Sequence, residues 1–206
     1  MVNVLKNVRL FRFLDHCDTV EIGRVSHAVY KIVTHPDWNT LTQSFDADIA
    51  VLVLEREVSF NEHIQPICLP SFHSNIVSIS KGIVVGFGKS EDETKFHENI
   101  PKILETPIHD NQDCFEDNDG LALLSSGRTF CGGQGRGVGV CVGDSGSGLI
   151  VTNGTTFYLR GIVSSSVKGG QYGCDVDTYA VFTDVLKFTD WINGISTDKF
   201  ALVRKK

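Results

Sequence analysis

Several features that would assign a protein to a common class are absent from this 206-residue sequence. No uninterrupted apolar run approaches the roughly 20 residues that a membrane-spanning helix needs. The net charge of −6 disfavours nucleic acid or an anionic membrane as a partner. The cysteines form no C-x-x-C pair, and neither a G-x-G-x-x-G nor a P-loop pattern occurs. The sequence therefore predicts a globular protein with no metal, no cofactor and no membrane or nucleic-acid partner.

The six cysteines are spread singly along the chain, which is typical of a disulfide framework. Such frameworks form in oxidising compartments, so the protein is expected to be secreted or extracellular. Met1 to Leu10 contains no apolar block of the signal-peptide type. Disulfides without a secretory signal predict that the front of the natural protein lies upstream of Met1.

The stretch Gly143-Asp144-Ser145-Gly146 is a candidate site for nucleophilic catalysis. A serine hydroxyl needs a base to take its proton and donors to hold the oxyanion that forms. Because glycine permits a tight turn, the backbone N–H groups of Gly143 and Ser145 can point at one spot. Gly, Ser and Asp are also ordinary turn residues, so a plain surface turn is the alternative.

Asp48 stands directly before the apolar run 49–54, which predicts a strand buried on both faces or nearly so. An acid at the head of such a strand is costly to bury unless something pairs with it. Asp46 is the competing acid, but no isoleucine follows it. A strand-start aspartate that caps a loop is the alternative reading of Asp48.

The remaining patterns predict an all-β protein with a C-terminal helix. Strands are expected near 8–10, 30–33, 83–88, 102–108 and 180–183, with a short helix or turn at 110–114. A hairpin of 148–152 and 157–163 is expected around Asn153-Gly154, and the apolar positions 185, 188, 192 and 195 predict a helix capped by Thr183 or Asp184. His35 is interpreted as a turn histidine. Asn153 also heads an N-glycosylation sequon, which matters if the chain is secreted.

From about Val8 to Ile195 the sequence resembles the trypsin-like (chymotrypsin-fold) serine proteases. The resemblance is carried by Asp48-Ile49-Ala50, by Pro66-Ile67-Cys68-Leu69-Pro70, and by Gly143-Asp144-Ser145-Gly146 with Cys141 before it. It implies two six-stranded antiparallel Greek-key barrels, the first incomplete, followed by a closing helix. The whole of 1–206 would be one peptidase domain, with the N-terminal barrel remnant and crossing segment in 1–70 and the C-terminal barrel and helix in 71–195.

The resemblance also implies two disulfides, Cys114–Cys131 and Cys141–Cys174. Six cysteines allow 15 connectivities, so the sequence alone would not give these pairs. Cys17 and Cys68 are left to join each other or partners outside this chain.

Carried over residue by residue, the resemblance makes Ser145 the nucleophile and Asp48 the acid that orients a histidine. Gly143 and Ser145 would form the oxyanion hole, and Asp144 would pair with an amino terminus released by activation. The substrate pocket would be lined by Gly139 at its floor and by Ala180, Ser164 and Ser166 at its walls. Because none of these side chains is charged, the sequence predicts a preference for uncharged, apolar or aromatic substrate side chains.

The catalytic histidine is not evident. In the family it precedes the acid by about 45 residues, near Asn3, where no histidine lies. His16, in a His16-Cys17 pair like that of the family, is one candidate, and a loop histidine is the alternative. Val8-Arg9-Leu10 resembles the strand that follows the catalytic histidine, which would place that histidine upstream of Met1.

Two functions follow from the sequence. One is a secreted serine endopeptidase acting on protein or peptide substrates, with protease inhibitors or an activating protease as further partners. The chain as given is then expected to be inactive for lack of the histidine. The other is a non-catalytic protease homologue that binds or regulates. An α/β-hydrolase is excluded because that class needs a histidine after the serine, and the last histidine, His109, precedes Ser145.

Overall fold

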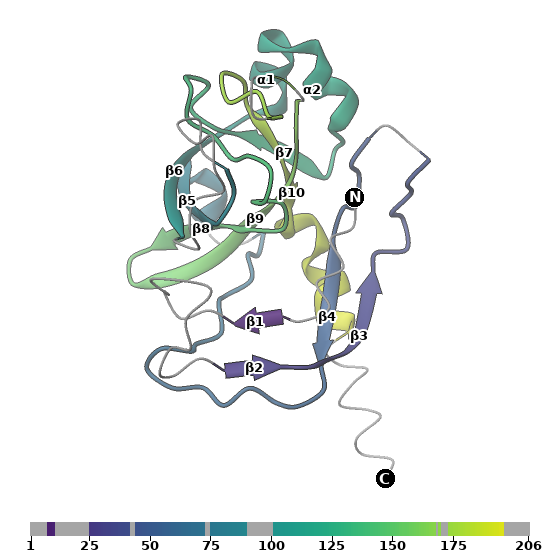
Figure 1. Ribbon diagram of the computed structural model, residues 1–206, viewed down its shortest axis with the longest axis vertical. Coiled ribbons are helices and arrows are strands. Elements are labelled where there is room, and N and C mark those ends of the chain that lie inside the picture. Colours follow the sequence, from purple (N-terminus) through teal and green to yellow (C-terminus); the bar gives the residue numbers. More distant parts are fainter. Residues whose placement is uncertain are drawn as a thin grey trace.

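The computed structural model describes residues 8–10, 25–41, 44–72, 75–89, 101–167, 169 and 173–195 (Figure 1). The strands are β1 (Val8–Leu10), β2 (Val25–His27), β3 (Val29–Thr34), β4 (Ala50–Leu54), β5 (Lys81–Gly86), β6 (Lys102–His109), β7 (Thr129–Gly132), β8 (Gly148–Asn153), β9 (Thr156–Ser166) and β10 (Ala180–Asp184). The helices are η1 (Asn75–Ser78) and η2 (Val185–Phe188), both 3₁₀, and α1 (Asn111–Asp117) and α2 (Asp119–Leu124), while 189–195 is also helical. In this part of the chain no helix has the length and apolar character needed to cross a bilayer.

Strands β5 to β10 form a closed antiparallel barrel in the order β10-β7-β6-β5-β8-β9. Burial alternates along β5, as expected when one face of a strand packs on a core. That core contains Val84, Leu149 and the rings of Phe130 and Phe182, which stack with centroids 5.4 Å apart. The barrel therefore gives the loops at its ends a rigid support.

The earlier part of the chain forms two strand pairs beside the barrel, β1 with β2 and β3 with β4 (Figure 1). The expectation that the strand after Asp48 is buried on both faces is wrong, because Ala50–Leu54 are all only partly buried. Among the described strands β4 pairs with β3 alone, so its apolar run is not enclosed as the barrel strands are. The predicted all-β fold, with one closed barrel, a second and incomplete set of strands and a C-terminal helix, is confirmed.

The C-terminal helix joins the two parts. Phe188 and Trp191 pack in one cluster with Ala47 and Ile49, the residues on either side of Asp48. The helix begins as a 3₁₀ turn, η2, in which the Asp184 carboxylate accepts the N–H of Leu186 at 3.0 Å. Such turns are frequent at helix N-termini, so the predicted cap is present but the first turn is not α-helical.

The hairpin at Asn153-Gly154 and the two disulfides also agree with the expectations from the sequence. β8 and β9 meet at Asn153-Gly154, where Gly154 has a φ of 60° that favours glycine. The disulfides join Cys114 to Cys131 and Cys141 to Cys174, the two pairs that the resemblance implies. Cys68 is exposed and bonds to no described cysteine, whereas Cys17 lies outside the described residues.

Candidate active site

Asp48 lies between β4 and the barrel and is half-buried. One carboxylate oxygen accepts a 2.8 Å hydrogen bond from the Ser164 hydroxyl on β9, and its backbone carbonyl accepts one of 2.9 Å from the Thr183 hydroxyl on β10. Burial raises the pKa of Asp48, and the hydrogen bond from Ser164 partly offsets this rise. The barrel therefore holds a partly desolvated carboxylate at a fixed place.

The segment before Asp48 is held by hydrogen bonds to the C-terminal end of α2. The N–H of Phe45 donates to the carbonyl of Leu124 at 2.9 Å, and the Ser44 hydroxyl donates to the carbonyl of Ser125 at 3.2 Å. Ala47 has a φ of 55°, which is unusual for a residue with a side chain and reverses the chain just before the acid. These hydrogen bonds and this backbone turn fix the position of Asp48.

Ser145 is exposed in a turn that is also fastened to β9. The N–H of Gly146 donates to the carbonyl of Val163 at 2.8 Å, and the N–H of Val163 donates to the carbonyl of Ser147 at 2.9 Å. Val163 directly precedes Ser164, which bonds Asp48. The predicted nucleophile and the predicted acid, far apart in the chain, thus attach to neighbouring residues of one strand.

The turn before Ser145 offers two backbone donors. Gly143 has a φ of 105°, and a Cβ there would meet the Cα of Gly88 at 3.0 Å, so a side chain would be strained. Within the described part of the chain, the N–H groups of Gly143 and Ser145 donate to no acceptor. Free, neighbouring N–H groups are what an oxyanion hole requires.

Asp144 is buried and accepts two backbone hydrogen bonds. Its Oδ1 takes the N–H of Gly88 at 2.7 Å, and its Oδ2 takes the N–H of Cys141 at 3.0 Å. A Cβ at Gly86 or Gly88 would lie 2.0 or 2.4 Å from the carboxylate, so both positions need glycine. Asp144 forms no ion pair with any described residue, and its pairing with an amino terminus stays a prediction.

A small pocket is lined by residues of the barrel strands and of the segments 133–140 and 175–178. Three of the four residues predicted to bind substrate line it: Gly139, Ser166 and Ala180. Ser164 is absent from the lining and instead holds Asp48. The Cys141–Cys174 disulfide ties together the two loops that carry the pocket.

Sequence reasoning missed one acid of this pocket. Asp175 is part of the lining, although it was not among the predicted site residues. Its position immediately after Cys174 was the available signal, because that cysteine was expected to brace the pocket.

The described residues place no base at the Asp48 carboxylate. His16 lies outside the described residues, and within them no histidine bonds to the Asp48 carboxylate. His35 occupies a turn as predicted: its Nδ1 accepts the N–H of Asp37 at 3.2 Å, and its ring packs against Phe188 and Trp191.

Comparisons with known proteins agree with this fold. A protein-family model described as Trypsin matches residues 12–192. Serine protease gd of Drosophila melanogaster is 34% identical over 84% of this chain and 39% of its own length. Phenoloxidase-activating factor 1 of Holotrichia diomphalia is 28% identical over 81% of this chain and 44% of its own length. A complement C1r subcomponent-like protein of Rattus norvegicus is 32% identical over 92% of this chain and 41% of its own length.

The fold is therefore that of a chymotrypsin-like β-barrel protein. Because the match covers most of the sequence, the chain belongs to the trypsin family of serine proteases. It spans less than half the length of the curated relatives just named.

Proposed function

We propose that this chain is the peptidase unit of a secreted serine endopeptidase, a single domain spanning 1–206. The observation that carries the proposal is the attachment of Asp48 and the Ser145 turn to neighbouring residues of β9. In this family two groups so placed flank a histidine. The disulfides fit an oxidising, extracellular environment.

In the proposed reaction Ser145 Oγ attacks the carbonyl carbon of a peptide bond as its proton passes to the histidine. The N–H groups of Gly143 and Ser145 hold the resulting oxyanion, and the histidine then protonates the leaving amine. Water hydrolyses the acyl-enzyme in a second round with the same base. Asp48 accepts the other N–H of the imidazole and stabilises its charged form, while Ser164 keeps the carboxylate in place. Either His16 or a histidine upstream of Met1 supplies the base.

The proposed partners are protein or peptide substrates, protease inhibitors and an activating protease. Activation would supply the amino terminus that pairs with Asp144. The exposed position of Asn153 at the hairpin between β8 and β9 suits N-glycosylation during secretion.

The test is hydrolysis of a broad peptide library by the chain and by the longest natural protein that contains it. We expect no turnover by the chain alone and turnover by the longer protein. Changing Ser145→Ala in the longer protein should reduce kcat by about 10³-fold or more. Turnover that survives Ser145→Ala would refute the assignment of the nucleophile, and loss of turnover on His16→Ala in an active form would identify the base.

A non-catalytic protease homologue is the second candidate. It is favoured by Asp144, which accepts hydrogen bonds from two neutral donors and pairs with no cation among the described residues. A longer protein that binds partners but hydrolyses no peptide of the library after activation would support this candidate.

A further inference from the structure

We propose that the peptide bond between Arg136 and Gly137 is a processing site, cut by a protease that selects basic side chains, and that the two products stay joined only through the barrel. The chain alone is expected to be inactive, so the cutting protease is a different molecule. The cleavage does not depend on the proposed function, because it concerns what is done to this chain. Only its consequence for the candidate active site rests on that function.

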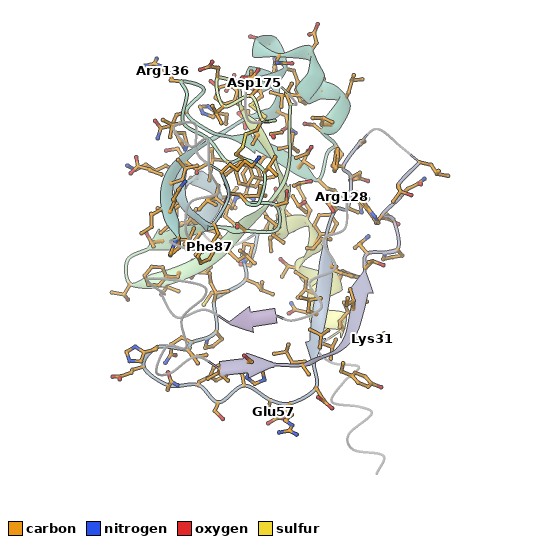
Figure 2. All side chains as sticks on the ribbon, in the orientation of Figure 1. Lys31, Glu57, Phe87, Arg128, Arg136 and Asp175 are labelled. Atoms are coloured by element: carbon orange, nitrogen blue, oxygen red, sulfur yellow. A yellow bond between two sulfur atoms is a disulfide. The ribbon has the colours of Figure 1, made fainter. Side chains whose placement is uncertain are left out.

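The loop that follows β7 carries an exposed arginine among glycines. The segment 133–140 contains no helix or strand. Gly133, Gly135 and Gly137 have φ values of 140°, 59° and 74°, which favour glycine. Arg136 is the one charged residue of this segment and is exposed. Figure 2 shows it at the end of the molecule that carries α1 and α2. A protease can therefore reach this side chain.

The loop is held at its two ends and not between them. The N–H of Gly133 donates to the carbonyl of Pro107 at 3.0 Å, and its carbonyl accepts a 3.2 Å hydrogen bond from Nε2 of His109. At the other end Val140 is buried in the barrel core. From 135 to 139, no backbone N–H or carbonyl bonds to a described residue. Drawing this part of the loop into the extended form that a protease binds breaks none of the described hydrogen bonds.

The other exposed basic residues are poorer sites. Among the described residues, Arg136 and Arg56 are the basic residues that are exposed outside helices and strands. Arg56 is followed by Glu57, whose carboxylate would disfavour the oxyanion that forms when the bond before it is cut. Gly137 follows Arg136 and brings neither a charge nor a side chain. The bond after Arg136 is therefore the favoured one.

No disulfide would join the two products. Hydrolysis adds the hydroxyl of water to the carbonyl carbon on the arginine side and the hydrogen to the glycine nitrogen, which gives 1–136 and 137–206. The disulfide Cys114–Cys131 lies wholly before the bond, and Cys141–Cys174 lies wholly after it. The two remaining cysteines of the sequence also precede the bond. The products are thus separate polypeptides.

The barrel would hold these polypeptides together. Strands β5 to β7 belong to 1–136 and β8 to β10 belong to 137–206, and the ladders β5–β8 and β10–β7 join them. Asp48 lies in the first product and Ser145 in the second. The 2.8 Å bond from Ser164 to Asp48 is one of the contacts across the break. The candidate active site would then last only while the two products stay associated.

The experiment treats the full chain with a small amount of trypsin in the absence of denaturant. The products are separated on a non-reducing denaturing gel and sequenced from their amino ends. We expect a fragment that begins at Gly137, formed about tenfold or more faster than one that begins at Glu57. Arg136→Gln should remove this fragment, Arg136→Lys should keep it, and the matched control Arg56→Gln should leave its rate unchanged. Elastase, which cuts after small apolar side chains, should still cut after the exposed Val138 in Arg136→Gln.

The cut product is then tested for association. It should elute from a sizing column at the volume of the intact chain. Its Tm should rise with protein concentration, because unfolding separates two molecules, whereas the Tm of the intact chain should not.

Three results would overturn the proposal. One is a Gly137 fragment that forms no faster than the Glu57 fragment. Another is a cleavage rate that follows global unfolding in urea, and the third is separation of the products on the sizing column without denaturant. A longer protein that hydrolyses no peptide would refute the proposed function and leave these results unchanged, because none of the measurements uses the activity of this chain.

Discussion

At the scale of single residues, the site holds acids in places where they cost stability. Asp48 is half-buried with one hydroxyl partner, and Asp144 is buried with two backbone donors. Burial raises the pKa of Asp48, so its charged form is held at a cost, whereas the charge of Asp144 is met by two backbone N–H groups. A buried acid whose charge is disfavoured is a candidate functional residue.

The change Asp48→Asn should stabilise the fold at neutral pH. The pKa of Asp48 is raised by burial, so the folded state binds its proton more tightly than the unfolded state does. Stability from this group therefore falls as pH rises above about 4 and is lowest above the folded pKa. Asparagine can keep the bond from Ser164 without the charge.

Thermal unfolding between pH 4 and 8 measures this effect. The Tm of Asp48→Asn should equal or exceed that of the wild type at pH 7, and the difference should shrink towards pH 4. A Tm several degrees lower at pH 7 would show that the charge is stabilised by a partner outside the described residues.

Gly88→Ala should disturb the Ser145 turn more than the fold as a whole. The new methyl would lie 2.4 Å from the Asp144 carboxylate and would push it away from the N–H of Cys141. We expect the amide of Cys141 to exchange with deuterium about tenfold faster while the Tm changes little, which hydrogen exchange and thermal unfolding measure. The control Gly127→Ala, where a Cβ meets nothing within 4 Å, should leave this exchange unchanged.

At the scale of elements, one acid fixes both a strand end and a helix start. Asp184, the last residue of β10, forms an ion pair with Arg160 of β9 and accepts the N–H of Leu186 at 3.0 Å. Both charged side chains are 9% exposed, and the Arg160 guanidinium also lies 4.6 Å from the ring centroid of Phe130. Breaking a buried pair from one side leaves the other charge uncompensated.

The two ways of breaking this pair should therefore differ. Asp184→Ala leaves a buried guanidinium whose Nε has no hydrogen-bond partner among the described residues, and should cost about 3–5 kcal/mol. Arg160→Met keeps much of the volume and leaves Asp184 with its bond from Leu186, so it should cost less. Denaturant unfolding of both variants measures the difference, and equal losses would contradict this account of the pair.

Elements with a strong local signal could be predicted from the sequence. Asn153-Gly154 predicts the hairpin because its φ requirement is local, and the spacing from Val185 to Ile195 predicts the C-terminal helix. The helix α2 was missed, since its start depends on the Asn118 side chain, which accepts the N–H of Gly120. At the site, the resemblance gave Asp48 and Ser145, but the bond of Asp48 to Ser164 and the place of Asp175 depend on packing of distant segments.

At the scale of the whole molecule, Arg128 ties the β3–β4 region to the barrel. Its guanidinium donates hydrogen bonds to Asp37 at 2.7 Å and to both carboxylate oxygens of Asp46. Asp46 also accepts a hydrogen bond from the Ser126 hydroxyl at 2.7 Å. Figure 2 shows Arg128 beside these strands. The hydrogen bonds from Arg128 lower the pKa of Asp46 against the opposing effect of burial. This contact joins residues 82 and 91 positions apart, so no local pattern could have predicted it.

Removing Arg128 should weaken the molecule at neutral pH but not in strong acid. Because the folded pKa of Asp46 is depressed, its contribution is present above the unfolded pKa and is lost as pH falls through the folded pKa. Arg128→Met should cost about 1–2 kcal/mol at pH 7, a modest value because the pair is partly exposed. The cost should shrink below about pH 3.

Urea unfolding at pH 7 and pH 2.5 provides the measurement. The control is Lys31→Met, which removes an exposed basic residue of β3. A loss that is the same at both pH values would attribute the role of Arg128 to its packing over the Phe188 ring, 5.3 Å from the guanidinium carbon, rather than to its charge.

The closed barrel determines which backbone amides exchange with solvent last. Each strand from β5 to β10 has a hydrogen-bonded neighbour on both sides, so no strand can peel away without breaking two ladders. Deuterium should therefore enter the amides of β8 and β9 last, together, and only on global opening. In the Ser145 turn the N–H of Gly146, which is bonded to Val163 of β9, should exchange slowly, whereas the N–H groups of Gly143 and Ser145, which donate to no described residue, should exchange fast.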